Sequence, residues 1–301
     1  MLSLIDNPVP WPNGARVAVC LSFDIDSDSI LHLDHGDAAV EMLAAQSWLR
    51  YDRLAVPRLI RIFQHFQCKQ TFFMPAWCME QYPQVVDAIL EAGHELAHHG
   101  YFHENPNQQP REDERYWLER SLEVFKTMTG ALPKGSRAPL YNFSQASFDL
   151  LVDAGFRYDA SLMGDDVPYV LRSGERELLE LPSHWGMDDW PQYVHAPEFQ
   201  YKMPIRAPSE AIKVYWDEFE AMWQHGGMLV AVWHPFVSGR LARAQAIVSL
   251  IERMLEKGAV WFASMAQIAS HIDHLRAQGQ FSPRIEPFPT YAGPVPRPRR
   301  P

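Results

Sequence analysis

Segments rich in apolar and β-branched residues alternate along this chain with segments whose apolar residues recur at helical spacing. The strand-like segments are residues 16–26, 70–75, 94–98, 132–139, 157–162, 228–235 and 259–265. The helix-like segments are residues 57–66, 83–93, 115–129, 144–156, 216–227 and 244–258. Strands that alternate with helices form a parallel sheet. With about seven such units, the sequence predicts an α/β barrel rather than an open sheet.

Two parts of the chain do not fit this alternation. Residues 165–209 are rich in Trp, Pro and Tyr and are too irregular for a strand–helix unit. We expect this insertion to form a lid, with a hydrophobic plug or a subunit contact as alternatives. Residues 281–301 contain seven prolines, which prevent regular structure. We therefore predict one barrel domain over residues 1–281 and an arm over residues 282–301, which lies on the body or on a neighbouring subunit, or is disordered.

Length and charge limit what the barrel can bind. A chain of 301 residues with 47% hydrophobic side chains can bury one large core. The formal net charge of −10 argues against nucleic acids and anionic membranes as partners, because both require clustered Lys and Arg. A small neutral or cationic substrate fits this charge better.

The sequence also suggests a compartment. The N-terminus has no basic segment leading into an apolar run, and no apolar run reaches the roughly 18 residues of a membrane span. Cys20, Cys68 and Cys78 are odd in number, and none belongs to a C-x-x-C pair. These features predict a reduced, cytoplasmic protein.

Reactive side chains follow four of the predicted strands. They are Asp24 and Asp26 after the first strand, His99 after the third, Arg137 after the fourth and His234 after the sixth. The carboxyl ends of parallel strands meet at one mouth of a barrel, where active sites form. We therefore expect these side chains to converge in space.

Four histidines occur within ten residues, at positions 94, 98, 99 and 103. Along an extended segment, alternation places His99 at the mouth of the strand. Gly100 lets the chain turn, and a helical turn before Pro106 would bring His103 back beside His99, where both imidazoles can reach one ion. His94 and His98 lie within the strand and are about 13 Å apart, so we expect them to be buried and hydrogen-bonded instead.

Two imidazoles and a carboxylate with one open position are typical of a catalytic metal site. Asp24 and Asp26 are two residues apart and point to the same side of the strand, so one can bind the ion while the other accepts a proton from water. The predicted cofactor is one divalent metal per chain. Zinc suits these ligands best, and Co, Ni, Mn or Fe could occupy them as well.

The segments "SFDID", "HHGYFHE", "SRAP" and "VAVWHP" together resemble the polysaccharide deacetylase family, which has NodB homology. The resemblance extends over about residues 10 to 270. It implies a distorted, seven-stranded (β/α) barrel and metal-assisted hydrolysis of an amide. It also implies a homo-oligomer, a dimer or a tetramer.

The resemblance assigns a role to each strand-end residue. Asp24 is the implied base, and Arg137 braces it. Asp26, His99 and His103 are the implied metal ligands. His234 is the implied acid that protonates the leaving nitrogen.

Two departures from the usual family pattern narrow the comparison. The second carboxylate of the first motif is moved by one residue to Asp26, and Gly100 stands where the family usually has Ser or Thr. These variants are similar to the branch that contains the Helicobacter-type peptidoglycan deacetylase, the cofactor-free allantoinases and the cyclic imide hydrolases. All of these open a carbon–nitrogen bond.

The insertion bears on the substrate. Trp185, Trp190 and Tyr193 would more naturally cover a small pocket than an open groove, which favours a small cyclic amide, imide or ureide. Asp165 is a further candidate lid residue, and Arg240 could hold a substrate carboxylate or carbonyl. The alternatives are deacetylation of an N-acetyl sugar or peptidoglycan, and a binding protein that keeps the metal without turnover. A phosphate or ester hydrolase would need a cluster of Arg and Lys that the motifs lack.

Overall fold

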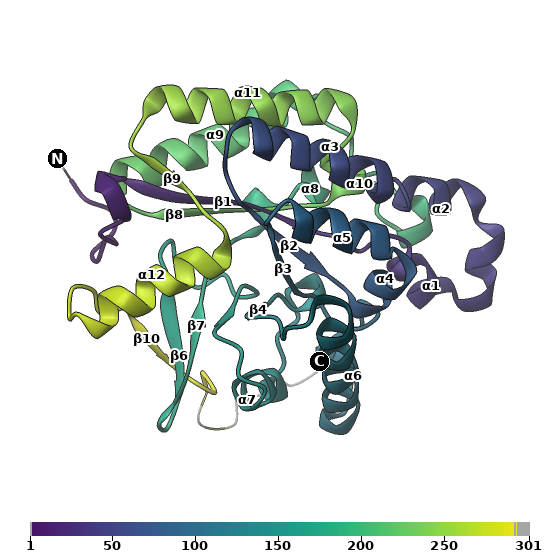
Figure 1. Ribbon diagram of the computed structural model, residues 1–301, viewed down its shortest axis with the longest axis horizontal. Helices are drawn as coiled ribbons and strands as arrows, with labels where there is room; N and C mark the ends of the chain where they lie inside the picture. The colour runs from purple at the N-terminus through teal and green to yellow at the C-terminus, as the bar shows by residue number, and fades with distance from the viewer. Residues whose placement is uncertain (1, 292, 294–301) are drawn as a thin grey trace, which may run out of the picture.

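The computed structural model of the protein describes residues 2–291 and 293 (Figure 1). Its strands are β1 (Val17–Asp24), β2 (Thr71–Met74), β3 (Glu95–His98), β4 (Gly135–Ser136), β5 (Tyr158–Asp159), β6 (Tyr169–Ser173), β7 (Arg176–Glu180), β8 (Met228–Trp233), β9 (Val260–Phe262) and β10 (Ile285–Pro287). Its α-helices are α1 (Ser29–His35), α2 (Leu43–Leu49), α3 (Asp52–His65), α4 (Ala76–Gln81), α5 (Pro83–Glu91), α6 (Arg111–Thr129), α7 (Gln145–Asp153), α8 (Trp190–Tyr193), α9 (Pro208–His225), α10 (Pro235–Ser238), α11 (Leu241–Lys257) and α12 (Met265–Ala277). None of the described helices is long and apolar enough to cross a membrane.

The sheet confirms the predicted α/β class. Strands β7, β5, β4, β3, β2, β1 and β8 follow one another across the sheet, and each neighbouring pair in this series is parallel. The segment after β7 reaches the other end of the series, because the Ser183 hydroxyl donates to the carbonyl of Val230 and the Asp189 N–H donates to the carbonyl of Val232. Side-chain and loop contacts, rather than a regular ladder, thus join β7 to β8 and give a distorted barrel.

Strand β1 lies next to β8, the last strand in the order of the sheet, and is buried along its whole length. It pairs with β8 along one edge. Its other edge pairs with β9 at Val17–Val19 and with β2 at Phe23–Asp24. The Gln70 side chain fills the gap between β9 and β2 and accepts a hydrogen bond from the N–H of Leu21 at 2.6 Å. Strand β1 is therefore held along both edges.

Alternation along β1 determines which side chains reach the active-site side. One face bears Val17, Val19, Leu21 and Phe23, which belong to the core that also contains residues of α3, α9 and α11. These three helices lie together over one side of the sheet in Figure 1. The other face bears Ala18 and Cys20, in a second core with residues of β2, β3, β5, β7, β8 and α12. Ser22 and Asp24 continue this inner face toward the end of the strand.

The insertion differs from the predicted lid. Its first part forms the antiparallel hairpin of β6 and β7, and β7 pairs with β5 as part of the barrel sheet. The strands of this hairpin are only five residues long and their buried residues are consecutive, so no alternation marks them in the sequence. Only the part after β7 reaches the mouth of the barrel.

The arm also contains regular structure. Residues Ile285–Pro287 form β10, which pairs with β6, and the Phe288 ring stacks on Phe148 of α7 with centroids 4.8 Å apart. The described part of the arm therefore lies on the body of the same chain. Residues 292 and 294–301 of the predicted arm lie outside the described residues.

The helices were predicted incompletely. Helix α3 begins at Asp52, so Pro57, the first residue of the predicted helix 57–66, lies inside the helix. Helices α1, α2, α4, α8, α10 and α12 were not predicted, although Ser264 caps α12 with a capping box. Ser144, the first residue of the predicted helix 144–156, caps α7.

Gly135 of β4 provides space that the barrel needs. A Cβ atom at this position would overlap the Tyr158 ring, whose hydroxyl donates to Glu95 at 2.9 Å. We expect Gly135→Ala to lower the free energy of unfolding by at least about 1–3 kcal/mol, as overpacked cores do, measured by urea denaturation. Gly293→Ala is the control, because among the described residues, its chain neighbours aside, no atom lies within 4 Å of its added Cβ. Equal stability of the two variants would contradict this interpretation.

Candidate active site

The carboxyl ends of the strands surround a cavity of about 870 Å³. It is lined by residues that follow β1, β3, β4, β7 and β8, among them Asp24, Asp26, His99, His103 and His234. The convergence that the strand ends predicted is therefore present. Arg137 is fully buried directly behind Asp24, and contacts the cavity through that residue.

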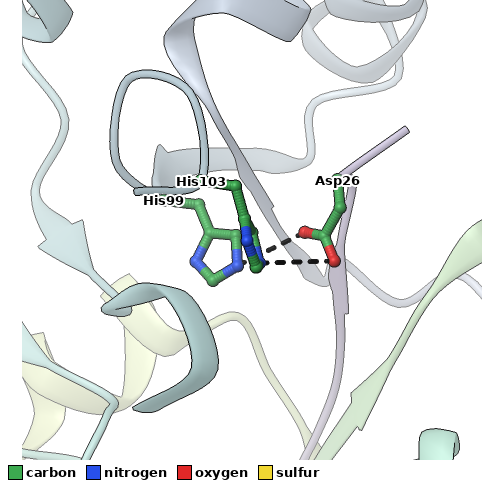
Figure 2. Close-up of side chains that lie close together, drawn as sticks. All are labelled: Asp26, His99 and His103. Carbon is green, nitrogen blue, oxygen red and sulfur yellow. Dashed lines mark ion pairs between the residues drawn. The ribbon is translucent and has the colours of Figure 1, made fainter. Parts of the chain in front are cut away.

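Asp26, His99 and His103 form a compact group at one side of this cavity (Figure 2). Their potential ligand atoms all lie within 4.8 Å of one another, and all three side chains are buried. The His99 Nε2 lies 3.3 Å from Asp26 Oδ1, and the His103 Nε2 lies 3.6 Å from Asp26 Oδ2. Two imidazoles and one carboxylate at these separations can bind one divalent ion.

Hydrogen bonding prepares this group for a cation. The His99 Nδ1–H donates to the carbonyl of Arg137 at 2.7 Å, which leaves the lone pair of Nε2 directed at Asp26. The Asp26 Oδ1 is buried and has no hydrogen-bond partner among the described residues. A buried carboxylate oxygen without a donor is costly unless a cation faces it. The donor set therefore fits a divalent metal ion.

The protonation states of Asp26 and His103 agree with a cation site. Burial raises the pKa of Asp26, but His103, His99 and His234 together lower it below its usual range. Burial lowers the pKa of His103 to about 4. At neutral pH, Asp26 is thus an anion and His103 a neutral imidazole, which are the forms that bind a metal.

The loop between the two histidines is bent rather than helical, contrary to the expected helical turn. Gly100 and His103 both have positive φ angles, +76° and +62°. The Glu104 carboxylate folds back and accepts hydrogen bonds from the N–H groups of Tyr101 and Phe102 at 3.0 and 2.6 Å. These contacts provide the turn that brings His103 to within 5.1 Å of His99, measured between ring centroids.

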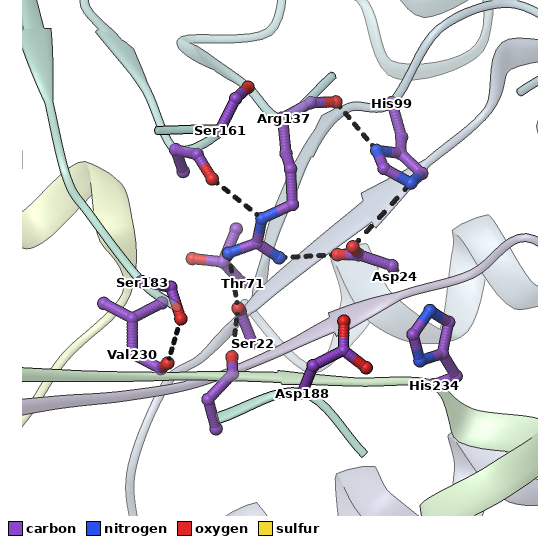
Figure 3. Close-up of polar contacts among 12 residues, drawn as sticks. Ser22, Asp24, Thr71, His99, Arg137, Ser161, Ser183, Asp188, Val230 and His234 are labelled. Carbon is purple, nitrogen blue, oxygen red and sulfur yellow. Dashed lines mark hydrogen bonds and ion pairs between the residues drawn. The ribbon is translucent and has the colours of Figure 1, made fainter. Parts of the chain in front are cut away.

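Arg137 orients Asp24 at the bottom of the site (Figure 3). Its guanidinium donates to Asp24 Oδ1 at 2.6 Å, to the Ser22 hydroxyl at 3.0 Å and to the carbonyl of Ala160 at 3.1 Å. The ring of Phe73 covers its face at 4.1 Å. Asp24 Oδ2 remains directed at His99 Nε2, 3.7 Å away. The guanidinium thus occupies Oδ1 and leaves Oδ2 available to accept a proton.

His234 lies on the opposite side of Asp26, with its Nε2 3.4 Å from Asp26 Oδ2. The Asp189 carboxylate accepts hydrogen bonds from His234 Nδ1 at 2.7 Å and from the His234 backbone N–H at 3.0 Å. Burial alone would lower the pKa of His234, but Asp189 and Asp26 raise it well above the usual value. His234 is therefore positioned as a protonated donor whose Nε2–H points into the site.

Asp189 was missed in the sequence because it follows no predicted strand. It lies in the irregular part of the insertion, and the only signal was the pair of carboxylates in "MDDW".

The residues predicted for the lid divide into two groups. Trp185 and Trp190 line the cavity, and the Trp190 ring lies 5.5 Å from His234. Tyr193, Asp165 and Arg240 are not among its lining residues, which corrects their assignment to substrate contacts.

Each of these three has another partner. Tyr193 is buried beneath the Arg243 guanidinium, Asp165 pairs with Arg284, and Arg240 lies over the Tyr51 ring. Asp165 and Tyr193 lie in the insertion and Arg240 lies close to His234 in the sequence. This proximity did not reveal that their side chains point away from the cavity.

The other histidines have structural contacts. His94 Nδ1 accepts a hydrogen bond from the Gln70 N–H, and His98 Nδ1 lies 3.0 Å from the Ser136 hydroxyl. Both rings are buried, and burial lowers the pKa of His94 to about 4 and of His98 to about 3. His225 accepts a hydrogen bond from the Leu4 N–H, away from the cavity.

Comparisons with known proteins point to one family. Residues 42–158 match the family model of polysaccharide deacetylases. The chain is 30% identical over 244 residues to a peptidoglycan deacetylase from Helicobacter pylori. The aligned region covers 72% of this chain and 83% of that protein. A crystal structure of a candidate polysaccharide deacetylase from Mycobacterium smegmatis is 37% identical, with a TM-score of 0.86 over 99% of this chain and 100% of that chain.

An allantoinase structure, Puue, shares the fold. Its TM-score is 0.79 at 23% identity, and the match covers 92% of this chain and 96% of that chain.

The contact between Asp189 and His234 makes a prediction that a titration can test. We expect Asp189→Asn to lower the pKa of His234 by about 1–3 pH units, because the carboxylate that stabilises the imidazolium is removed. The His234 ring signals in a nuclear magnetic resonance titration measure this change. Asp165→Asn, which removes a carboxylate outside the cavity, should leave the titration unaltered. An unchanged titration in Asp189→Asn would limit Asp189 to holding the His234 backbone.

Proposed function

This chain belongs to the polysaccharide deacetylase family, and we propose that it is a metal-dependent hydrolase that opens the carbon–nitrogen bond of a small cyclic amide, imide or ureide. The observation that carries the proposal is the placement of a free carboxylate, Asp24, and a protonated imidazole, His234, around the group of Asp26, His99 and His103. A site that only binds a metal has no need of an additional acid and base.

Asp26, His99 and His103 would hold the ion. A divalent ion bound there supplies a Lewis acid that polarises a carbonyl oxygen and lowers the pKa of water. Zinc suits two imidazoles and a carboxylate best, and Co, Ni, Mn and Fe are alternatives for the same ligands.

Asp24 supports the first proton transfer. The Arg137 guanidinium occupies Asp24 Oδ1, so Oδ2 is the oxygen that takes the proton from the attacking water. Because Arg137 is buried and also bound to Ser22 and Ala160, it keeps the carboxylate from rotating away. The base is thus oriented before substrate binds.

His234 supports the second proton transfer. An amide nitrogen leaves poorly unless it is protonated, and the Nε2–H of His234 points into the cavity from the side opposite His99. Asp189 holds the ring by Nδ1 and stabilises its charge. Trp190 packs against the ring and limits the access of water to it.

The cavity favours a small substrate over a long chain. Five aromatic side chains form a wall around the mouth: Tyr141, Trp185, Trp190, Phe199 and Tyr201. Aromatic rings bind flat, uncharged rings well, but they also stack on sugars. A deacetylase of N-acetyl sugars or peptidoglycan is therefore the second candidate, supported by the naming of the Helicobacter pylori relative.

The proposal is tested by loading the protein with Zn²⁺ or Co²⁺ and assaying hydantoin, allantoin, succinimide, glutarimide and N-acetylglucosamine. We expect ring opening of at least one cyclic substrate. Asp24→Asn should retain the metal and lose about 10²–10⁴-fold in kcat, because a carboxamide cannot accept the proton. Turnover of N-acetylglucosamine alone would favour the second candidate. Near-normal kcat in the metal-loaded variant would remove Asp24 as the base.

Metal content provides an independent prediction. We expect one divalent ion per chain in the wild-type protein, measured by inductively coupled plasma mass spectrometry after dialysis. His99→Ala should lose this stoichiometric metal, because Nε2 of His99 faces Asp26. His98→Ala is the matched control, since His98 points to Ser136 and not to the cavity. Circular dichroism verifies the folding of both variants, and loss of the ion from His98→Ala alone would contradict the ligand assignment.

A further inference from the structure

Asp188 is a buried carboxylate in the cavity that takes no part in the two proposed proton transfers. It is 3% exposed, lines the cavity, and lies beside His234 in Figure 3. One of its carboxylate oxygens lies within 4.8 Å of a His234 ring nitrogen. The next residue, Asp189, turns away to hold His234, so the two carboxylates have different tasks.

Two donors fix the orientation of the Asp188 carboxylate. The Trp190 N–H donates to Oδ1 at 2.7 Å, and the Tyr141 hydroxyl donates to Oδ2 at 2.5 Å. An ionised carboxylate has about four acceptor positions, so these two bonds leave capacity on the side that faces the cavity. Asp188 can therefore accept a hydrogen bond from a bound molecule without losing its own contacts.

The charged side chains that line the cavity indicate what kind of substrate it can bind. Five carboxyl groups line it, those of Asp24, Asp26, Asp34, Glu104 and Asp188. Among the described residues, none of those that line the cavity is Lys or Arg. Apart from the protonated His234, a substrate carboxylate would have no cationic side chain to pair with, and it would face Asp188. An uncharged molecule with an N–H donor suits this wall instead.

We propose that Asp188 is a specificity-determining residue that accepts a hydrogen bond from a substrate N–H outside the scissile bond, and that it disfavours substrates with a carboxylate. The inference rests on the proposed function and narrows its substrate class to uncharged ring ureides that carry a second N–H. Tyr141 positions the carboxylate by its hydrogen bond.

Asp188→Asn is a conservative test of this role. The Asn carbonyl can keep the bond from the Trp190 N–H, which turns its NH₂ group toward Tyr141 and the cavity. The Tyr141 hydroxyl can accept from that group, so both local contacts are retained. What changes is that a donor then faces the substrate N–H, and that one negative charge is gone.

Three substrates separate recognition from chemistry. Hydantoin has a second ring N–H, 1-methylhydantoin lacks it without alteration of the scissile bond, and hydantoin-5-acetic acid adds a carboxylate. For the metal-loaded Asp188→Asn protein, we expect KM for hydantoin to rise about 10–100-fold with kcat nearly unchanged. KM for 1-methylhydantoin should stay within about threefold. KM for hydantoin-5-acetic acid, which also carries the second N–H but no longer faces a negative charge, should rise less than KM for hydantoin. Asp87→Asn, which removes an exposed carboxylate of α5, is the control for net charge.

Each outcome decides between this inference and the proposed function. Equal losses on all three substrates would mean that Asp188 only supports the loop, and would overturn the specificity role while the hydrolase stands. The specificity role is also overturned, while the hydrolase stands, if the wild-type protein prefers the carboxylate substrate. The same conclusion follows if it deacetylates N-acetylglucosamine but opens no hydantoin. If wild-type metal-loaded protein hydrolyses no carbon–nitrogen substrate, the proposed function itself fails and this inference fails with it.

Discussion

The buried ion pair between Arg137 and Asp24 is the interaction on which the rest of the site depends. Arg137 has no exposed surface, and its guanidinium links β1 through Ser22 and Asp24 to the carbonyl of Ala160 after β5. Such a pair offsets its desolvation only when the remaining donors are bonded, and loss of one partner typically costs about 3–5 kcal/mol. Because the same residue also accepts the Nδ1–H of His99 at its carbonyl, one side chain and its backbone orient both the proposed base and a candidate metal ligand. The geometry of the proposed proton acceptor and that of the candidate cation site are therefore not independent.

A second set of contacts organises the opposite side of the cavity. The adjacent carboxylates of Asp188 and Asp189 come from a loop, yet their backbone is registered against Val232 of β8. This registration directs Asp189 at His234 and Asp188 at Tyr141, so consecutive residues serve different atoms. The cavity is thus bounded by two sides. The candidate cation site derives from residues after β1 and β3, and the proposed proton donor derives from β8 and is held by the insertion.

The sequence predicted the parts of this arrangement that follow regular periods. Alternation along β1 and the ends of β3, β4 and β8 located Asp24, Asp26, His99, Arg137 and His234, because parallel strands bring their carboxyl ends together. The turn to His103 was placed correctly in space but not in conformation, since Glu104 forms it through backbone contacts that have no sequence period. Asp189 was missed and Asp165, Tyr193 and Arg240 were misplaced for one reason. In irregular segments the direction of a side chain is set by tertiary contacts, here with Arg284, Arg243 and Tyr51.

The junction between β7 and β8 has a consequence for motion in the barrel. Elsewhere the strands of the barrel are joined by ladders, but here a serine hydroxyl and a few loop contacts connect the two ends of the sheet. Regions with few backbone hydrogen bonds are the first to open in local unfolding, long before the whole domain does. The residues that form this junction also include the partner of His234, so a brief opening of the barrel wall would separate the imidazole from its carboxylate. The lifetime of the closed wall then sets how long His234 and Asp189 stay in contact, and hydrogen exchange of the Asp189 amide, which donates to the carbonyl of Val232, reports on both at once.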